Sequence, residues 1–570
     1  MKVVIVGGVA GGATAAARLR RLNEEAEIIV LERTGYVSYA NCGLPYYIGG
    51  TIQDKGALTL QTPESFRARF NIDVRVKNEV LSIQPEEHTV TVRRLEDGSE
   101  YTETYDKLIL SPGAKAIRPP LPGIDLEGIF TLRTVEDTFR IRNFLERERP
   151  QSAVVVGGGF IGLEMAENLI HAGVHTTMIQ LDDQVLLPLD KDMAGEVHAY
   201  LRGQGLDLRL STAVTGFRRR GGKLETLIGE QEPVAADLVI LAIGVAPESD
   251  LARRAGLTLG QKGSIAVDAC MRTSRPDIYA VGDAVELTHA VTGQKALVAL
   301  AGPANRQGRI AADHICGLEQ SYAGAQGSSI LKLFGMTAAA TGLNERAAQA
   351  AGMTYDKAVT YSASHASYYP GAQNMTIKTL FDPATGRILG AQIVGFDGVD
   401  KRIDVMATAI RAGLTARQLT ELDLAYAPPY SSAKDPVNMA GYVIENLRMG
   451  LVEQYHWNQV AGLPSDGSVI LLDVRTPDEV AQQGLLRPDA IHIPLDSLRQ
   501  RIGELDAAKK IYVNCYSGLR SYLACRILSQ KGFQCANLSG GWRFWSYAAQ
   551  DRVHDAAPTH PCGIPAEKKI

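Results

Sequence analysis

The stretch "KVVIVGGVAGGATAAARLRRL", residues 2–22, decides the fold of the N-terminal part of the chain. An apolar strand leads into a glycine-rich turn and an amphipathic helix, and residues 26–33, "AEIIVLER", add a second apolar strand. This order is typical of a dinucleotide-binding βαβ unit, whose glycines let the backbone approach a pyrophosphate at the helix N-terminus. Glu32 ends the second strand, where a carboxylate can accept hydrogen bonds from a ribose.

A second unit of the same kind covers residues 153–181, "AVVVGGGFIGLEMAENLIHAGVHTTMIQL". Here all three glycines of GxGxxG are present, whereas Val9 replaces the middle glycine in the first unit. Two such units indicate two cofactors, as a hydride relay requires. The ribose-reading position of the second unit is Gln180, and no arginine lies nearby to bind a 2′-phosphate. We therefore predict NADH rather than NADPH as the electron donor.

The composition is that of an ordinary globular protein. The 570 residues exceed what one hydrophobic core can organise, so several domains are expected. A net charge of −4 gives no reason to expect a nucleic-acid partner. No apolar run is long enough for a bilayer and no secretory signal precedes the first strand, so no membrane association is expected. The seven cysteines form no CxxC pairs, so neither a disulfide framework nor a metal site is expected. This cysteine usage predicts a reducing, cytoplasmic setting.

Two further stretches extend the nucleotide-binding pattern. They are residues 105–123, "YDKLILSPGAKAIRPPLPG", and residues 277–287, "DIYAVGDAVEL", which place Asp283 after a strand. The four motifs in this order resemble the two-dinucleotide pyridine nucleotide–disulfide oxidoreductase family, in which such an aspartate binds the ribityl chain of FAD. The resemblance implies an α/β fold with two Rossmann-like domains, one for FAD and one for NAD.

The resemblance also implies which residues contact the cofactors. For FAD they are Gly7, Ala10, Gly11, Gly12, Glu32, Arg33, Val80, Pro112, Gly113, Gly282, Asp283 and Ala301. For NADH they are Gly157, Gly159, Phe160, Ile161, Gly162, Glu164, Gln180 and Gly244, with Glu164 orienting the nicotinamide.

Residues 38–50, "SYANCGLPYYIGG", contain a cysteine with no second cysteine before Cys270. The stretch is similar to the single-cysteine branch of the family, which contains coenzyme A-disulfide reductases, NADH oxidases and NADH peroxidases. The dithiol branch has its second cysteine at the position of Tyr47. The resemblance implies that Cys42 forms a mixed disulfide, persulfide or sulfenic acid with an exogenous partner. The thiolate is the reactive species, and an adjacent flavin supplies the two electrons that break an S–S bond.

Several residues resemble the coenzyme A contacts of the coenzyme A-disulfide reductases. They are Arg18 and Arg21 on the first helix, Ser38 and Asn41 beside the cysteine, and Asn305 and Arg309 in "GPANRQGR". Arginine suits phosphate because its planar fork makes bidentate, charge-assisted hydrogen bonds. The resemblance implies coenzyme A as a bound substrate or prosthetic group.

Residues 362–372, "SASHASYYPGA", and 422–438, "LDLAYAPPYSSAKDPVN", resemble the family's dimerisation domain. In that domain tyrosines reach the partner subunit's cysteine, and Tyr368 and Tyr426 are the matching residues. A phenol with a pKa of about 10 can donate a proton to a leaving thiolate. The resemblance implies a homodimer and an α+β dimerisation domain.

The C-terminal part resembles a single rhodanese domain, an α/β fold. Its signature is the loop Cys515-Tyr516-Ser517-Gly518-Leu519-Arg520 between a strand and a helix, with "DVR" at 473–475 upstream. Backbone N–H groups around the sulfur and the helix N-terminus favour a thiolate or persulfide anion. Cys515 is the expected persulfide carrier and Arg520 belongs to its catalytic loop, whereas Cys525 and Cys535 are expected to be core residues.

The whole chain resembles coenzyme A-disulfide reductase–rhodanese fusions, a group that includes NADH-dependent persulfide and polysulfide reductases. The implied reaction passes hydride from NADH to FAD, cleaves an S–S bond at Cys42 and delivers sulfane sulfur through Cys515. The alternatives are an NADH oxidase or peroxidase that uses a Cys42 sulfenic acid, and a non-catalytic redox sensor or sulfur carrier. The expected domains are FAD binding (1–115 and 250–322), NAD(H) binding (116–249), dimerisation (323–448), a linker (449–461), rhodanese (462–555) and a disordered tail (556–570).

Overall fold

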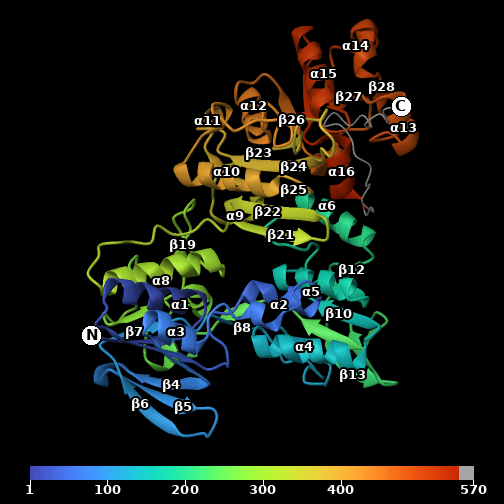
Figure 1. The fold of residues 1–570 in the computed structure, drawn as a ribbon. Coiled ribbons are helices and arrows are strands. Elements are labelled where there is room, and N and C mark those ends of the chain that lie inside the picture. The colour runs from blue at the N-terminus through green and yellow to red at the C-terminus, as the bar shows by residue number, and fades with distance from the viewer. Residues whose placement is uncertain (551–570) are drawn as a thin grey trace. The chain divides into compact units, whose positions relative to one another are not determined.

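The computed structural model describes residues 1–550, which form two compact units (Figure 1). Unit 1 contains Met1–Asp182 and Leu206–Gly327, and unit 2 contains Asp183–Gly205 and the described residues from Ser328 onward. The expected tail with Cys562, and the end of the expected rhodanese range, lie outside the described residues. Within residues 1–550, no helix has both the length and the apolar character needed to cross a bilayer.

The first sheet of unit 1 is parallel, in the order β18-β7-β1-β2-β3. Val3–Val6 of β1 is buried because helices cover both faces of such a sheet. Helices α1 and α8 lie side by side (Figure 1). The elements are β1 (Lys2–Val6), α1 (Ala10–Leu22), β2 (Glu27–Glu32), α2 (Leu44–Ile48), α3 (Pro63–Phe70), β3 (Asp73–Val76), β7 (Lys107–Leu110), α7 (Asp250–Arg254), β18 (Ile278–Ala280) and α8 (Ala301–Ile315).

The second sheet of unit 1 is also parallel, in the order β12-β11-β10-β16-β9. Its elements are β9 (Ile129–Thr131), α4 (Val135–Glu148), β10 (Ser152–Val156), α5 (Phe160–His171), β11 (His175–Ile179), β12 (Asp207–Arg209) and β16 (Leu238–Leu241). Both predicted Rossmann-like folds are confirmed, since each is a parallel sheet whose glycine-rich turn leads into a helix.

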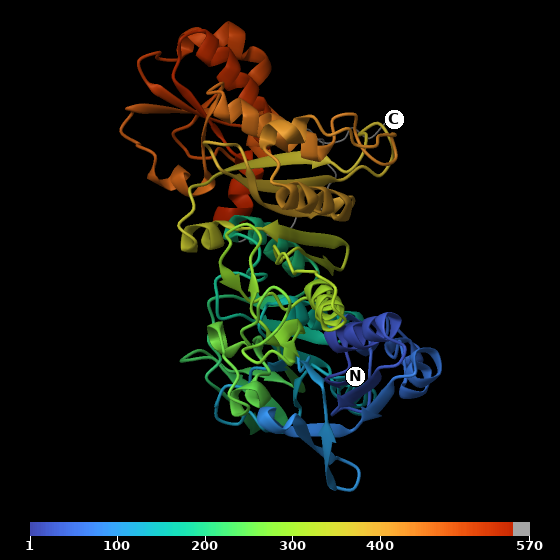
Figure 2. The same cartoon turned by 90° about the vertical axis from the view of Figure 1, so that its left-hand side faces the viewer.

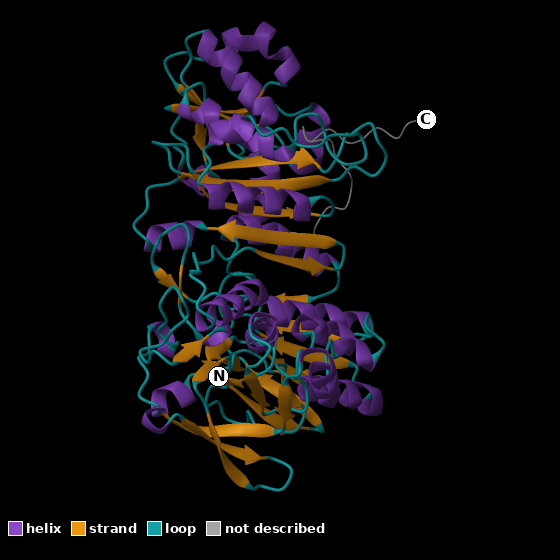
Figure 3. Cartoon of the chain, turned by 60° about the vertical axis from the view of Figure 1, so that its left-hand side comes forward, coloured by secondary structure: helices purple, strands orange, loops and turns teal. Residues whose placement is uncertain are grey.

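Small antiparallel sheets accompany the two parallel sheets of unit 1, and they appear as strands in Figure 3. One contains β4 (Asn78–Gln84), β5 (Thr89–Arg94) and β6 (Glu100–Thr104). A second contains β13 (Gly216–Arg220), β14 (Lys223–Leu227) and β15 (Val234–Ala236). Two pairs complete the unit: β8 (Ala114–Ala116) with β17 (Val245–Pro247), and β19 (Leu287–Thr288) with β20 (Lys295–Ala296).

Unit 2 contains an antiparallel sheet in the order β21-β22-β25-β24-β23. Its strands and helices are β21 (Ser329–Leu333), β22 (Met336–Gly342), α9 (Glu345–Ala350), β23 (Asp356–Ala363), β24 (Asn374–Phe381), β25 (Ile388–Gly395), α10 (Val399–Ala412), α11 (Ala416–Thr420) and α12 (Pro436–Arg448). This sheet and its helices form the α+β domain expected from the sequence.

A parallel sheet ends unit 2, in the order β26-β30-β29-β27-β28, with helices around it (Figure 2). Its elements are β26 (Glu453–Tyr455), β27 (Val469–Asp473), α13 (Pro477–Gln483), β28 (Ile491–His492), α14 (Leu495–Arg501), β29 (Lys510–Asn514), α15 (Leu519–Gln530), β30 (Cys535–Leu538) and α16 (Gly541–Ala549). Strand β26 lies within the range expected to be a linker, and it pairs with β30 as part of this sheet.

Helix α6 (Lys191–Gly203) belongs to unit 2 and packs against α16. The approach is close, because a Cβ on Gly195 would lie 2.3 Å from the Tyr547 carbonyl oxygen. Arg543 Nη2 donates to Glu196 Oε1 at 2.6 Å, and both side chains are buried. The last helix of the rhodanese-like sheet is therefore held to α6 by a desolvated ion pair.

Candidate functional site

The turn between β1 and α1 forms the first nucleotide cradle. Gly7 has a φ of 96°, and a Cβ on it would lie 2.1 Å from the Ser111 carbonyl oxygen. A Cβ on Gly12 would lie 1.9 Å from the Gly7 carbonyl oxygen. Val9 occupies the N-cap of α1 without a side-chain cap, so the first N–H groups of the helix are left for a phosphate. This cradle fits the pyrophosphate of FAD.

The carboxylate of Glu32 is fixed at the end of β2. The Gly8 N–H donates to Glu32 Oε2 at 2.9 Å, and the Thr34 N–H donates to Oε1 at 2.9 Å. Each carboxylate oxygen retains capacity for a further hydrogen bond, as ribose recognition requires.

Asp283 lies in the 3₁₀ turn Gly282–Ala284 directly after β18. Burial raises the pKa of the Asp283 carboxyl, and Arg133 opposes that shift from 3.6 Å. The Gln307 side chain, on α8, accepts from the Gly282 N–H at 2.7 Å. Arg133 and Gln307 were not predicted from the sequence, since no local motif marks a residue that contacts the site from a distant element.

The remaining predicted FAD residues follow the same sheet. Ala10 and Gly11 begin α1, Pro112 and Gly113 follow β7, and Ala301 begins α8, whereas Val80 is buried in β4. Arg33 lies 3.5 Å from Glu248 and is half exposed. Their contacts to FAD stay a prediction.

The turn between β10 and α5 forms the second cradle. Gly157 has a φ of 107°, and a Cβ on it would lie 2.3 Å from the Ala242 carbonyl oxygen. A Cβ on Gly162 would lie 1.9 Å from the Gly157 carbonyl oxygen. A Cβ on Gly159 would meet no atom of the described residues within 4 Å, so the space before α5 is open. This cradle fits the pyrophosphate of NADH, with Phe160 and Ile161 as the first residues of the helix.

Gln180 and Glu32 hold equivalent positions in the two cradles. The Gly158 N–H donates to Gln180 Oε1 at 2.7 Å, just as the Gly8 N–H donates to Glu32. Gln180 Nε2 in turn donates to Asp182 Oδ2 at 3.0 Å. The second cradle therefore presents an amide and a carboxylate at the ribose position. Gly244, with a φ of 127°, follows β16 at the same edge of the sheet.

Cys42 lies in the 3₁₀ turn Asn41–Gly43 and is open to solvent. Crowding by protein atoms raises the pKa of its thiol, and the nearby carboxyls of Glu164 and Asp283 raise it further, while Arg133 opposes them. Glu164 comes from the helix of the second cradle, and Asp283 comes from the strand end beside the first. The thiol is therefore placed where residues of both cradles act on it.

Glu164 is a partly buried carboxyl on the first turns of α5. Burial raises its pKa to about 7. The Tyr46 hydroxyl donates weakly to Glu164 Oε1 at 3.5 Å. A carboxyl that titrates near neutral pH is able to exchange a proton under working conditions.

Three of the six predicted coenzyme A residues come together on α1 and α8. Arg18 Nε lies 2.6 Å from Asp313 Oδ1, and Arg309 Nε lies 3.7 Å from Asp313 Oδ2. Thr14 Oγ1 donates to Asn305 Oδ1 at 3.0 Å on the same pair of helices. The buried Asp313 orients both guanidinium groups from beneath, and their remaining N–H groups can bind phosphate.

The other three predicted coenzyme A residues are placed differently. Arg21 is exposed in the last turn of α1. Asn41 stands next to Cys42, and Ser38 adopts the left-handed backbone conformation with a φ of 46°. That conformation is uncommon for a residue with a Cβ, and it turns the chain between β2 and the cysteine.

Tyr368 and Tyr426 meet in unit 2. Their hydroxyl oxygens lie 2.8 Å apart and both rings are exposed. The hydrogen bond with Tyr426 raises the pKa of Tyr368, which keeps its phenol protonated. The structure thus joins two residues from loops that the sequence could only match separately.

The loop between β29 and α15 surrounds the Cys515 sulfur. The Gly518 N–H lies 3.1 Å from Cys515 Sγ, and Ser521 Oγ donates to the same sulfur at 3.2 Å. Cys515 and Ser521 are fully buried. Ser521 was not predicted, although its place one residue after the CxxGxR pattern is the signal that could have identified it.

Arg520 is a loop-positioning residue in this geometry. Its Nη1 and Nη2 donate to the two carboxylate oxygens of Glu479 at 2.8 and 2.7 Å, and both side chains are buried. Asp473 and Arg475, the predicted upstream pair, form a second buried bidentate ion pair whose Nη2–Oδ2 distance is 2.6 Å. These two pairs fix α13 and the end of β27 around the loop.

Gly541 closes the loop from the other side. It has a φ of 65°, and a Cβ on it would lie 2.7 Å from Cys515 O, Gly518 N and Ser517 N. The Trp542 N–H donates to the Cys515 carbonyl oxygen at 2.7 Å. The start of α16 therefore supports the backbone that surrounds the sulfur.

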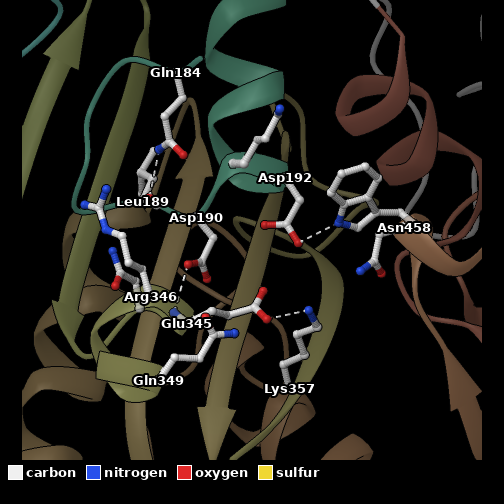
Figure 4. Close-up of a pocket in the computed structure, with 12 residues that line it drawn as sticks. Gln184, Leu189, Asp190, Asp192, Glu345, Arg346, Gln349, Lys357 and Asn458 are labelled. Carbon is white, nitrogen blue, oxygen red and sulfur yellow. Dashed lines mark hydrogen bonds and ion pairs between the residues drawn. The ribbon is translucent and has the colours of Figure 1, made fainter. Parts of the chain in front are cut away.

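A polar pocket of about 250 Å³ also lies in unit 2 (Figure 4). Lys378 Nζ is 2.9 Å from Asp190, 2.7 Å from Asp192 and 2.5 Å from Glu345. The buried ammonium thus occupies the centre of the three carboxylates, so this cluster is an ion-pair network that already contains its cation. Trp457 Nε1 donates to Asp192 Oδ2 at 3.1 Å and ties the start of the rhodanese-like domain to α6.

Three family models match successive parts of the chain. Residues 1–308 match the model described as pyridine nucleotide-disulphide oxidoreductase, residues 329–436 match that family's dimerisation domain, and residues 457–548 match a rhodanese-like domain. A coenzyme A disulfide reductase of Staphylococcus haemolyticus is 36% identical over 447 residues, which are 78% of this chain and 100% of that protein.

Two solved structures resemble nearly the whole chain. The crystal structure of reduced Bacillus anthracis CoADR-RHD has a TM-score of 0.93 and 46% identity, covering 96% of this chain and 98% of that chain. The NAD-dependent persulfide reductase from A. fulgidus has a TM-score of 0.89 and 40% identity, covering 96% of this chain and 100% of that chain.

Proposed function

We propose, because this chain belongs to the pyridine nucleotide-disulphide oxidoreductase family, that it is an FAD-dependent NADH:disulfide and persulfide reductase with a rhodanese domain. The observation that carries the proposal is the position of Cys42. Glu164 from the NADH cradle and Asp283 from the FAD cradle both raise the pKa of its thiol. No second cysteine lies nearby in the sequence. One chain thus combines a lone reactive sulfur with two dinucleotide sites.

The residues divide the work as follows. The turns at Gly7 and Gly157 hold the two pyrophosphates, and Glu32 and Gln180 read the riboses. FAD, when bound, accepts hydride from NADH and supplies two electrons to an S–S bond. The Cys42 thiolate attacks one sulfur of the acceptor's S–S bond, so that a mixed disulfide or a persulfide forms on Cys42 and the other sulfur leaves as a thiol, and Glu164 can hold or release a proton beside it.

NADH is the proposed donor. Gln180 and Asp182 occupy the ribose position of the second cradle, and a 2′-phosphate there would face the carboxylate of Asp182. The specificity constant should therefore be higher with NADH than with NADPH.

Coenzyme A is the proposed thiol group of the acceptor. Arg18 and Arg309, oriented by Asp313, present cations on the surface of α1 and α8. Acceptors of this kind are coenzyme A disulfide, coenzyme A persulfide and polysulfide, and we propose that the enzyme acts as a cytoplasmic homodimer. Tyr368 and Tyr426 would then protonate the thiolate that leaves the partner subunit's cysteine.

The rhodanese domain is the proposed source of sulfane sulfur. Gly518 and Ser521 stabilise a thiolate or persulfide on Cys515. Transfer from that persulfide to the acceptor at Cys42 would supply the reductase.

Two single variants test the division of labour. Cys42→Ser should abolish anaerobic NADH oxidation by coenzyme A disulfide and persulfides, keep its flavin and keep sulfurtransfer from thiosulfate. Cys515→Ser should lose sulfurtransfer and keep coenzyme A disulfide reduction. Cys270→Ser, a cysteine of unit 1 whose thiol contacts the Gln320 carbonyl oxygen, serves as the control.

Loss of both activities in either variant, with flavin and fold intact, would contradict two separate sites. Faster NADH oxidation with oxygen than with any sulfur acceptor would instead identify an oxidase.

A further inference from the structure

Two cysteines of the rhodanese domain lie against each other outside the Cys515 loop. Cys525 is on α15 and Cys535 begins β30. The Cys535 thiol lies 3.4 Å from the Cys525 carbonyl oxygen, and the two thiol groups also hydrogen-bond to one another. Both are free thiols in this structure. The sequence predicted that both are core residues, but it did not predict that they form a pair.

The two thiols have different surroundings. Cys525 is 1% exposed, whereas Cys535 is partly exposed. The hydrogen bond from Cys525 lowers the pKa of Cys535; Arg526 lowers it as well, whereas burial and Glu453 raise it. The same hydrogen bond and burial raise the pKa of Cys525. An accessible thiol that forms the thiolate readily attacks first, and a shielded thiol resolves the product.

We propose that Cys535 and Cys525 form a redox-active dithiol, separate from Cys515, that sulfane sulfur oxidises to a disulfide. The oxidant is a persulfide or polysulfide, the acceptor class of the proposed function on which this inference rests.

The reaction balances in two steps. The Cys535 thiolate attacks the outer sulfur of a persulfide RSSH and forms a Cys535 persulfide, while the thiol RSH leaves with the released proton. Cys525 then attacks the Cys535 Sγ, the Cys525–Cys535 bond forms, and the outer sulfur leaves as hydrogen sulfide. The two thiols lose two electrons, and the sulfane sulfur gains them.

The place of the pair links it to the persulfide loop. Cys525 lies four residues after Ser521, one helical turn along α15, and Ser521 donates to Cys515 Sγ. A Cys525–Cys535 bridge would tie this helix to β30 while leaving Cys515 free. Sulfane sulfur in excess over the reductase would thus be reduced to hydrogen sulfide within the domain that carries it.

The test uses the full-length flavoprotein, reduced with dithiothreitol, desalted without oxygen and exposed to inorganic tetrasulfide without NADH. After quenching with N-ethylmaleimide, trypsin should release residues 521–526 joined to residues 532–543, a pair that dithiothreitol separates. Two alkylatable thiols should disappear for each bridge. Full alkylation of both cysteines after tetrasulfide would overturn the proposal.

Variants separate the steps and the sites. Cys525→Ala should accumulate a persulfide on Cys535, trapped as its maleimide adduct, and absence of that adduct would overturn the order of attack. Cys515→Ser should keep the bridge, and its loss there would show that the sulfur comes through Cys515 and overturn direct attack by Cys535. Cys42→Ser should also keep the bridge. Formation of the Cys525–Cys535 disulfide and NADH-dependent turnover are therefore measured independently, so either can fail without the other.

Discussion

The hydroxyl oxygens of Tyr368 and Tyr426 lie 2.8 Å apart, although 58 positions separate the two residues in the chain. Each phenol orients the other, so the proton that they deliver belongs to the pair. We expect Tyr368→Phe and Tyr426→Phe each to lower kcat for coenzyme A disulfide, by about 10²-fold. The double variant should be little worse than either single one, because groups that act as a unit are not additive.

Tyr430→Phe is the matched control for the tyrosine pair, since Tyr430 is an exposed tyrosine from the same loop as Tyr426. Steady-state kinetics and light scattering of the same samples separate a catalytic loss from a change of assembly. Strictly multiplicative losses in the double variant would show that the two phenols act independently.

Glu164 should make stability depend on pH. Burial raises its pKa to about 7 from an ordinary value of 4.5. Because the folded carboxyl holds its proton more tightly than the unfolded one, its stabilising contribution is complete below pH 4.5 and is lost as the pH rises towards 7. The glutamine of Glu164→Gln does not ionise. The free energy of unfolding of this variant, measured against that of wild type, should therefore rise by on the order of 2 kcal/mol from about pH 5 to about pH 8.

Urea unfolding of the flavin-loaded proteins at the two pH values measures this difference. Glu146→Gln, an exposed carboxyl of α4, should show no comparable trend. A stability difference between Glu164→Gln and wild type that stays the same at both pH values would refute the shift.

Ser521 should control the reactivity of Cys515. Its hydroxyl donates to Cys515 Sγ at 3.2 Å from a fully buried position. Removing a hydrogen bond of about 1 kcal/mol to the reacting sulfur should slow thiosulfate sulfurtransfer about fivefold. Ser521→Ala is compared with Ser529→Ala on the same helix, by the rate of thiosulfate sulfurtransfer. Equal sulfurtransfer rates in the two variants would rule out this role.

Gly541→Ala should disrupt the persulfide loop. The added Cβ would come within 2.7 Å of three backbone atoms of the loop, Cys515 O among them. Gly532→Ala carries a comparable backbone strain, with a φ of 86°, but meets no atom of the described residues within 4 Å. We expect Gly541→Ala to lower the rate of thiosulfate sulfurtransfer by at least about 10²-fold, because moving a reacting group by about 1 Å can cost that factor in rate. If Gly532→Ala loses as much activity, strain rather than contact is the cause.

Local pattern was enough to predict the two Rossmann-like folds, and the resemblance to a rhodanese domain predicted the loop around Cys515. The glycines of both cradles and Cys515 stand at fixed offsets from apolar strands, so their surroundings follow from neighbours in sequence. Val9 shows the limit of the pattern, because the cradle forms with valine at the position of the middle glycine.

Residues that meet across long separations escaped prediction. Gln307 reaches the Gly282 N–H from α8, and Glu479 holds Arg520 from another helix. No sequence motif identifies such pairs, because the packing of distant elements brings the residues together and their separation along the chain follows no fixed pattern. Strand β26 was missed for the same reason, since its partner β30 lies at the other end of the domain.

The Arg543–Glu196 pair constrains how such a chain can change over generations. A gene truncated before the rhodanese domain would remove the guanidinium and leave Glu196 on a face shaped to be covered, with Asp192 also losing Trp457. Deletion would expose the surface of α6 that packs against α16, so further substitutions on α6 would be needed before the loss could be tolerated. The rhodanese domain can therefore be gained in a single fusion event, whereas its loss requires a deletion together with further substitutions on α6.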